Sequence, residues 1–130
     1  FIAQKSQRGK RVSLKEIAAA IDSPIAFTAK ILQVLAKASI VNSTKGLHGG
    51  YEIEKERLPK ISLKQIVQAI DGNRIFYGCA LGLKICNAKE PCPMHSQFVI
   101  IRNKLSETLA LSNLPNVAMD LNLGLTVLKR

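Results

Sequence analysis

Residues 12–51 read VSLKEIAAAIDSPIAFTAKILQVLAKASIVNSTKGLHGGY, and this stretch decides the fold. Its first part, Ser13-Leu14-Lys15-Glu16, has the capping-box pattern that begins a helix, and apolar residues at helical spacing follow it. Asp22-Ser23-Pro24 then signals a second helix start. We therefore predict a short helix over residues 13–21 and a longer one that runs from Pro24 to about Ser39.

A hairpin is expected directly after the second helix. Residues 40–44 have a strand pattern, residues 45–50 form a glycine-rich turn, and residues 51–54 alternate like a returning strand. The three glycines of the turn reach positive φ at little cost and let the backbone approach another surface closely. Two helices in a helix-turn-helix followed by a hairpin make a winged helix, whose hairpin tip, the wing, would meet the DNA backbone or minor groove.

The segments on either side of this stretch read mainly as helix. Residues 1–4 resemble the end of an apolar helix, and the capping box Ser62-Leu63-Lys64-Gln65 opens a helix that ends at Asp71-Gly72. Pro93 starts a long helix that ends near residues 113–115. Residues 117–128 are apolar and fit either a terminal helix or a strand. The expected fold class is mainly α with a small β-hairpin.

The charge of the chain is strongly basic. It contains 19 Lys and Arg residues and 9 Asp and Glu residues, which gives a net charge of +10. Residues 1–51 hold eight basic and two acidic residues. This bias favours a polyanionic partner such as double-stranded DNA, although a solvated basic surface is the alternative. The sequence contains no run of about 18 apolar residues, so we expect no membrane span and a cytoplasmic protein.

The second helix of the pair is the candidate for base contacts. With Phe27 and Ile31 assigned to the core, Thr28 and Lys30 are its only strong hydrogen-bonding side chains. Affinity would then depend on phosphate contacts and on the wing. The candidate residues for these contacts are Lys10, Arg11, Lys15, Lys45, His48, Gly49 and Tyr51. The alternative is a protein-interaction module, in which His48 is no more than a polar loop residue.

The only three cysteines lie within fourteen residues, in the pattern C-x6-C-x5-C-x2-H formed by Cys79, Cys86, Cys92 and His95. An odd number of cysteines argues against a disulfide framework. Soft sulfur ligands select zinc, copper(I) or iron–sulfur clusters, and three Cys with one His also suit structural zinc. Three free thiols, or a thiol redox switch without metal, are the alternatives. No acid–base constellation and no C-x-x-C pair point to an enzyme.

Several motifs resemble those of one known family. They are Val12-Ser13-Leu14-Lys15-Glu16-Ile17-Ala18, Ile31-Leu32-x-x-Leu35 with Ile40-Val41, Lys45-Gly46-x-x-Gly49-Gly50-Tyr51, and Ile61-Ser62-Leu63 through Val67-x-Ala69-Ile70-Asp71-Gly72. Together with the cysteine loop and the long helix, they resemble the Rrf-type winged-helix transcription regulators, the family of the iron–sulfur regulator IscR and the nitric-oxide sensor NsrR. The resemblance covers nearly the whole chain.

The resemblance implies a homodimer built on the long helix and a two-iron two-sulfur or four-iron four-sulfur cluster held by the three cysteines. It implies that His95 is the fourth ligand, as in the IscR-like branch, and that about fourteen residues precede Phe1. The chain also departs from the family pattern. The first cysteine gap has six residues instead of five. Ala29, Lys30 and Lys45 replace the frequent Glu, Gln and Arg, so we expect a different DNA sequence preference.

These inferences divide the chain into three parts. Residues 1–72 are expected to be the DNA-binding domain, a winged helix-turn-helix with a truncated first helix. Residues 73–92 are expected to form the cluster-binding loop, and residues 93–130 the dimerisation helix and a tail. The expected function is a dimeric transcription regulator that senses iron–sulfur status, redox state or nitric oxide. The alternative is a zinc-stabilised or thiol-redox winged-helix protein without an iron–sulfur cluster.

Overall fold

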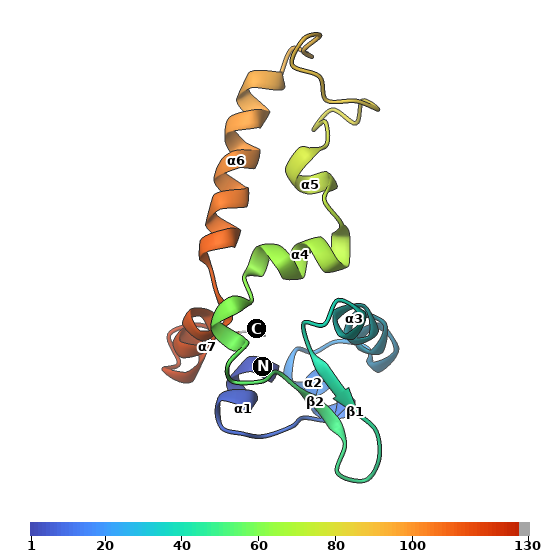
Figure 1. Ribbon diagram of the computed structural model, residues 1–130, viewed down its shortest axis with the longest axis vertical. Helices are drawn as coiled ribbons and strands as arrows, with labels where there is room; N and C mark the ends of the chain where they lie inside the picture. Colours follow the sequence, from blue (N-terminus) through green and yellow to red (C-terminus); the bar gives the residue numbers. More distant parts are fainter. Residues whose placement is uncertain (128–130) are drawn as a thin grey trace.

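The computed structural model describes residues 1–127 and has an elongated shape (Figure 1). The first three helices and the hairpin lie at one end of the long axis, and the cysteine loop lies at the other. The elements in chain order are α1 (Ile2–Gln7), α2 (Leu14–Ala20), α3 (Ile25–Lys37), β1 (Asn42–Thr44), β2 (Gly50–Glu52), the 3-10 helix η1 (Leu58–Lys60), α4 (Leu63–Asp71), α5 (Arg74–Tyr77), α6 (His95–Leu111) and α7 (Leu114–Asn122).

Helices α2 and α3 form the predicted helix-turn-helix. The capping box at the start of α2 is present: the Ser13 hydroxyl accepts from the Glu16 backbone N–H, and the Ser13 backbone N–H donates to the Glu16 carboxylate at 2.7 Å. The bond from the Ser13 backbone N–H, followed by one from the Ser13 hydroxyl to the same carboxylate at 2.7 Å, holds the pKa of Glu16 below its usual value. The chain direction turns by 111° between the two helices, within the range typical of this motif.

The hairpin β1–β2 is antiparallel and pairs Asn42 with Glu52 and Thr44 with Gly50. A third segment joins its edge, because the backbone of Val12 exchanges two hydrogen bonds with Tyr51, at 3.1 and 2.8 Å. Gly50 makes this approach possible: its φ is +143°, and a Cβ there would lie 2.8 Å from the Val12 carbonyl oxygen. The predicted winged helix is therefore confirmed, with its wing fastened to the start of the helix-turn-helix.

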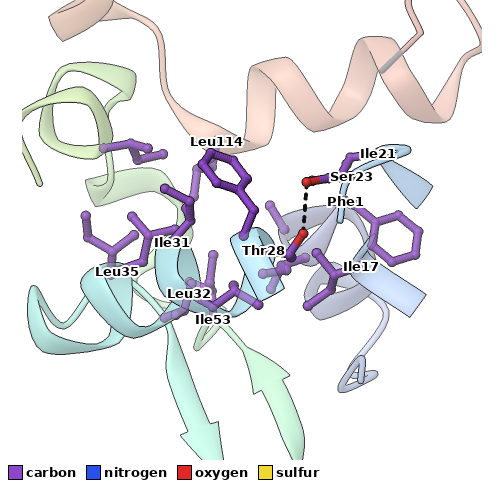
Figure 2. Close-up of a pocket in the computed structure, with 16 residues that line it drawn as sticks. Phe1, Ile17, Ile21, Ser23, Thr28, Ile31, Leu32, Leu35, Ile53 and Leu114 are labelled. Carbon is purple, nitrogen blue, oxygen red and sulfur yellow. Dashed lines mark hydrogen bonds between the residues drawn. The ribbon is translucent and has the colours of Figure 1, made fainter. Parts of the chain in front are cut away.

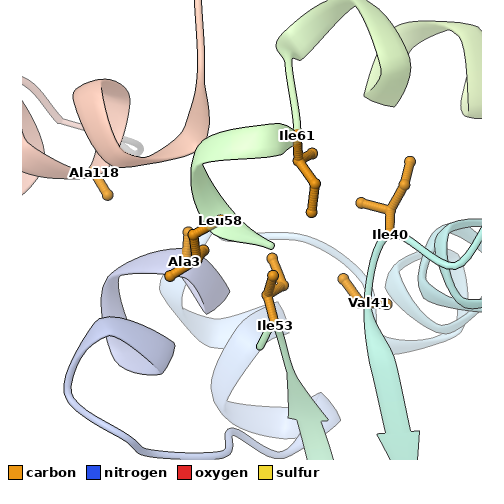
Figure 3. Packing of buried hydrophobic residues seen from close by; sticks show 7 residues of the cluster. All are labelled: Ala3, Ile40, Val41, Ile53, Leu58, Ile61 and Ala118. Carbon is orange, nitrogen blue, oxygen red and sulfur yellow. The ribbon is translucent and has the colours of Figure 1, made fainter. Parts of the chain in front are cut away.

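The core lies where the hairpin base meets α1, η1 and α7 (Figure 3). Its main cluster contains Ala3, Ile40, Val41, Ile53, Leu58, Ile61 and Ala118, and a smaller one contains Val12, Ile17 and Leu32. The buried Ser6 hydroxyl accepts from the Ile53 backbone N–H at 2.9 Å, which satisfies an amide that burial would otherwise leave unpaired.

The inward face of α3 differs from the prediction. Phe27 was assigned to the core, but its side chain is 59% exposed and lines an open apolar pocket of about 270 Å³ (Figure 2). Thr28 was expected to face DNA, but it is buried together with Leu32, one turn further on. This orientation of the helix is possible because the Thr28 hydroxyl finds its hydrogen bonds locally: it donates to the Pro24 carbonyl oxygen at 3.0 Å and lies 3.1 Å from the Ser23 hydroxyl.

Other boundaries differ in smaller ways. The one-turn helix α5 was not predicted, and α6 begins at His95 instead of Pro93. The ambiguous apolar segment is helical through Asn122, with Pro115 in the first turn of α7, while position 128 lies outside the described residues. Within residues 1–127, no single helix is long and apolar enough to cross a membrane. The sharply bent pair α2 and α3 meets that criterion only when the two helices are counted together.

Candidate functional site

Helix α3 presents a polar stripe to solvent on the side away from the core. Ala26, Lys30, Gln33 and Lys37 are all exposed and follow one another at intervals of three or four residues, so they share one face of the helix. Lys30 therefore lies where it was predicted, whereas Thr28 lies on the opposite, buried side. Gln33 was missed by the sequence analysis. The helical interval from Lys30 to Gln33 was the signal that could have found it.

Three predicted phosphate-binding residues flank the start of this motif. Lys10 and Lys15 are exposed, the second in the first turn of α2. Arg11 is also exposed, and its Nε lies 2.7 Å from the Glu52 carboxylate on β2. This ion pair occupies one edge of the guanidinium and leaves its terminal NH2 groups free of carboxylates among the described residues. It also places Arg11 beside the wing.

The tip of the wing is open to solvent. Lys45 and His48 are exposed there, and Leu47 is 96% exposed. An apolar residue this exposed has no role in the core, and sequence analysis did not single it out. Gly49 is a structural requirement of the tip, since a Cβ at this position would lie 2.2 Å from the Thr44 carbonyl oxygen. Tyr51 is half-buried and packs against both core clusters, so it supports the wing from below.

The cysteine loop connects α5 to α6 at the far end of the molecule (Figure 1). All three cysteines are free thiols and half-buried. The structure brings the predicted ligands together in two pairs: the Cys86 sulfur lies 3.5 Å from the His95 Nδ1, and the Cys92 side chain is near enough to Cys79 to help lower the pKa of that thiol. Within residues 1–127, no three His, Cys, Asp or Glu side chains are close enough to share one metal ion.

Local hydrogen bonds lower the pKa of the Cys79 thiol. The backbone N–H of Leu83 is the main influence that lowers the pKa of Cys79, with smaller contributions from Leu81, the Cys92 side chain and the charge of Arg102. Cys79 and Cys86 also line an open pocket of about 580 Å³, together with Arg74 and Lys84. Both thiols are thus reachable from solvent, and the surroundings of Cys79 favour the thiolate, which is the form that binds metal.

The donor set fits an iron–sulfur cluster or zinc in its chemistry, because thiolate sulfur and imidazole nitrogen suit both. The loop from Gly78 to Met94 contains no helix or strand, so the two donor pairs are joined by chain that can adjust. Arg102 of α6 touches this loop twice. Its Nη1 lies 3.3 Å from the Cys86 sulfur and also donates to the Gly78 carbonyl oxygen.

Comparison with protein families gives one match that spans most of the chain. Residues 1–120 match the family model of Rrf2, described as an iron-dependent transcriptional regulator. The chain belongs to the Rrf2 family. A protein of Aquifex aeolicus (strain VF5), named as an HTH-type transcriptional regulator, is 28% identical over 102 residues, which are 77% of this chain and 70% of that protein.

Solved structures of other Rrf2 regulators share the fold. IscR of T. potens is 25% identical, with a TM-score of 0.69 over 92% of this chain and 76% of that one. CymR, the global cysteine regulator of B. subtilis, is 22% identical, with a TM-score of 0.68 over 91% of this chain and 84% of that one. The chain is therefore a winged-helix, DNA-binding transcriptional regulator of the Rrf2 family and not an enzyme.

Proposed function

We propose that this Rrf2 regulator works as a cytoplasmic homodimer whose affinity for DNA depends on an iron–sulfur cluster. The cluster would be held by Cys79, Cys86 and Cys92, with His95 as the fourth ligand. The observation that carries the proposal is the position of all three thiols on one loop, outside the winged helix, with His95 at the start of the next helix and 3.5 Å from the Cys86 sulfur. The sensed event would be the assembly, oxidation, nitrosylation or loss of that cluster.

The DNA-binding part of the proposal rests on the basic face built by α3 and the wing. Lys30 and Gln33 are the side chains of α3 that can reach base edges, because both are polar and exposed on one stripe. Lys10, Arg11 and Lys15 would contact phosphates, while Lys45 and His48 would enter the minor groove or meet the backbone. Thr28 is removed from the predicted set because it is buried.

The homodimer is supported by the surface of α6. None of the 17 residues of this helix is buried, although many are apolar. Ile100 is 70% exposed, Ile101 57% and Leu111 74%. A second copy of the helix is the partner that would cover these side chains, since burial of apolar surface is favourable at about 25 cal/mol per Å².

The cluster would be held by the loop and the first turn of α6. When bound, an iron–sulfur cluster supplies a centre that reacts with oxidants and nitric oxide. The chain contributes the thiolates, the His95 imidazole and the link from the loop to α6. Through linkage, the cluster can shift DNA binding only by its different affinity for two geometries of the dimer. Ordering of the loop and the start of α6 is the difference we propose.

DNA binding is tested by titration of the protein against duplex DNA over a range of salt concentrations. The logarithm of the affinity should fall linearly with the logarithm of salt concentration, with a slope of about −0.9 for each phosphate neutralised. Lys30→Ala and Lys45→Ala should each weaken binding. Binding that does not respond to salt would argue against this function and for a protein partner.

The cluster is tested by anaerobic reconstitution, a visible spectrum, and counts of iron and sulfide. Wild-type protein should show cluster absorbance, and Cys86→Ala should lose it while the fold persists. Ser96→Ala is the matched control, since this exposed residue lies one position after His95 and has no donor role. Colourless protein with one zinc per chain would support the zinc-stabilised alternative. Colourless protein without metal would support a thiol-redox regulator.

A further inference from the structure

The guanidinium of Arg102, on α6, contacts the cysteine loop at two places. Its Nη1 donates to the carbonyl oxygen of Gly78, the residue before Cys79, and lies 3.3 Å from the Cys86 sulfur in the middle of the loop. The side chain is half-buried between α6 and the loop. A single group thus holds two points of the chain that are eight positions apart.

The contact belongs to a polar stripe along α6. His95 lies seven residues before Arg102, which is two helical turns, so both project from the same side of the helix. Both contact Cys86, His95 at 3.5 Å and Arg102 at 3.3 Å. One turn beyond Arg102, the Ser106 hydroxyl accepts from the Lys64 ammonium of α4 at 2.7 Å. Cys86 is therefore held between two side chains of a rigid helix.

The charge of Arg102 has no other partner near it. Among the described residues, the ion pairs are Arg11–Glu52 and Lys104–Glu107, so no carboxylate neutralises Arg102. Thiolates and their metal centres are anionic, and a half-buried guanidinium stabilises them more than an exposed one does. Both contacts come from Nη1, one arm of the planar guanidinium fork, whose two N–H bonds diverge and can reach a carbonyl and a sulfur together.

We propose that Arg102 is the positioning residue of the sulfur site, the set formed by Cys79, Cys86, Cys92 and His95. It fixes Cys86 beside His95 by tying the loop to α6, and its positive charge raises the reduction potential of the centre that the thiolates hold. The second half of this inference rests on the proposed cluster. The first half does not, because the contacts of Arg102 are made by the protein alone.

Two variants separate the contact from the charge. Arg102→Met removes both, whereas Arg102→Lys keeps the charge and loses the fork. The matched control is Lys104→Gln, which removes a positive charge from an exposed position two residues along the same helix. In metal-free reduced protein, endoproteinase Lys-C should cut after Lys84 and Lys89 several-fold faster in both Arg102 variants and at the wild-type rate in the control.

The effect of the Arg102 charge is measured by the midpoint potential of the reconstituted cluster, since nearby charge and hydrogen bonds to sulfur set such potentials. Arg102→Met should shift the potential to more negative values, and Arg102→Lys should restore most of the shift. An unchanged cleavage rate in Arg102→Met would overturn the positioning role. A potential that is equally negative in both variants would overturn the role of the charge. If wild-type protein binds no cluster, the proposed function fails, while the cleavage rates still decide whether Arg102 holds the loop.

Discussion

At the scale of single residues, the hydrogen bonds of the Thr28 hydroxyl allow this polar side chain to be buried on the inner side of α3. It lies 3.1 Å from the Ser23 hydroxyl, as Figure 2 shows, and donates to the Pro24 carbonyl oxygen at 3.0 Å, so burial costs it no hydrogen bond. Its neighbour Phe27 is the larger apolar residue, yet it remains 59% exposed at an open pocket. Polar character alone therefore did not identify a DNA-contacting residue.

Replacement of Thr28 by valine tests this assignment. Thr28→Val keeps the shape of the side chain but loses the hydroxyl, and should lower the free energy of unfolding by about 0.5–1.5 kcal/mol. DNA affinity per folded molecule should stay unchanged. Lys30→Ala should do the reverse, with weaker DNA binding and a stability change within about 0.5 kcal/mol. Urea unfolding and DNA titration measure the two effects. If Thr28→Val keeps the wild-type stability but binds DNA more weakly, Thr28 must be assigned to the DNA interface.

At the scale of elements, the wing is a small sheet that depends on contacts between three segments. Val12 pairs with Tyr51 along one edge, Arg11 bonds Glu52 beside it, and the tip closes through a hydrogen bond from the Gly49 N–H to the Gly46 carbonyl oxygen at 3.0 Å. A hairpin of two three-residue strands is marginal alone. Its attachment to the residues before α2 makes the wing part of the helix-turn-helix body.

Gly49→Ala should disrupt the wing without unfolding the core. The added Cβ would lie 2.2 Å from the Thr44 carbonyl oxygen, which is backbone and cannot rotate away, so the tip must open. We expect several-fold weaker DNA binding and altered amide signals for the residues of the hairpin, with little loss of helical circular dichroism. Ser43→Ala, an exposed change in β1, is the control and should leave DNA affinity near the wild-type value. Equal affinities for the two variants would show that the tip makes no contribution.

At the scale of the whole molecule, the sulfur site and the wing lie at opposite ends of the long axis (Figure 1). Direct contact between them within one chain is excluded by this arrangement. The physical connection runs through α4, α5 and α6: the Lys64 ammonium bonds Ser106 at 2.7 Å and lies 5.3 Å from the centre of the Phe76 ring. A second copy packed on α6 would offer another connection, from the loop of one subunit to the winged helix of its partner.

The oligomeric state tests this second connection. Ile100→Glu places a charge in the exposed apolar face of α6 and should convert dimers to monomers, because a carboxylate is costly to bury without a partner. Asn116→Glu adds the same charge at an exposed polar position on α7, outside the apolar face of α6, and should leave the dimer intact. Sedimentation equilibrium measures the mass, and DNA affinity should fall only for Ile100→Glu. A wild-type monomer at all concentrations would contradict the homodimer.

The sequence alone determined the starts of α2 and α4 and the existence of the wing. The capping boxes at Ser13 and Ser62 are hydrogen-bond patterns among residues three positions apart, so the chain specifies them before any long-range contact forms. The glycines of the wing act through backbone geometry, which is equally local. The spacing of the three cysteines placed them on one loop, and the structure brings Cys86 of that loop within 3.5 Å of His95 at the start of α6.

Only the tertiary structure decided the rotation of α3, the helix α5 and the contact of Arg102 with the loop. Apolar residues surround much of α3, so periodicity allowed more than one buried face, and packing against α2 and the hairpin selected the one with Thr28 and Leu32. Arg102 is 24 positions from Gly78 and 16 from Cys86, and no local pattern links residues at such separations. Contacts of this kind depend on how α6 packs beside the loop, which only the folded chain fixes.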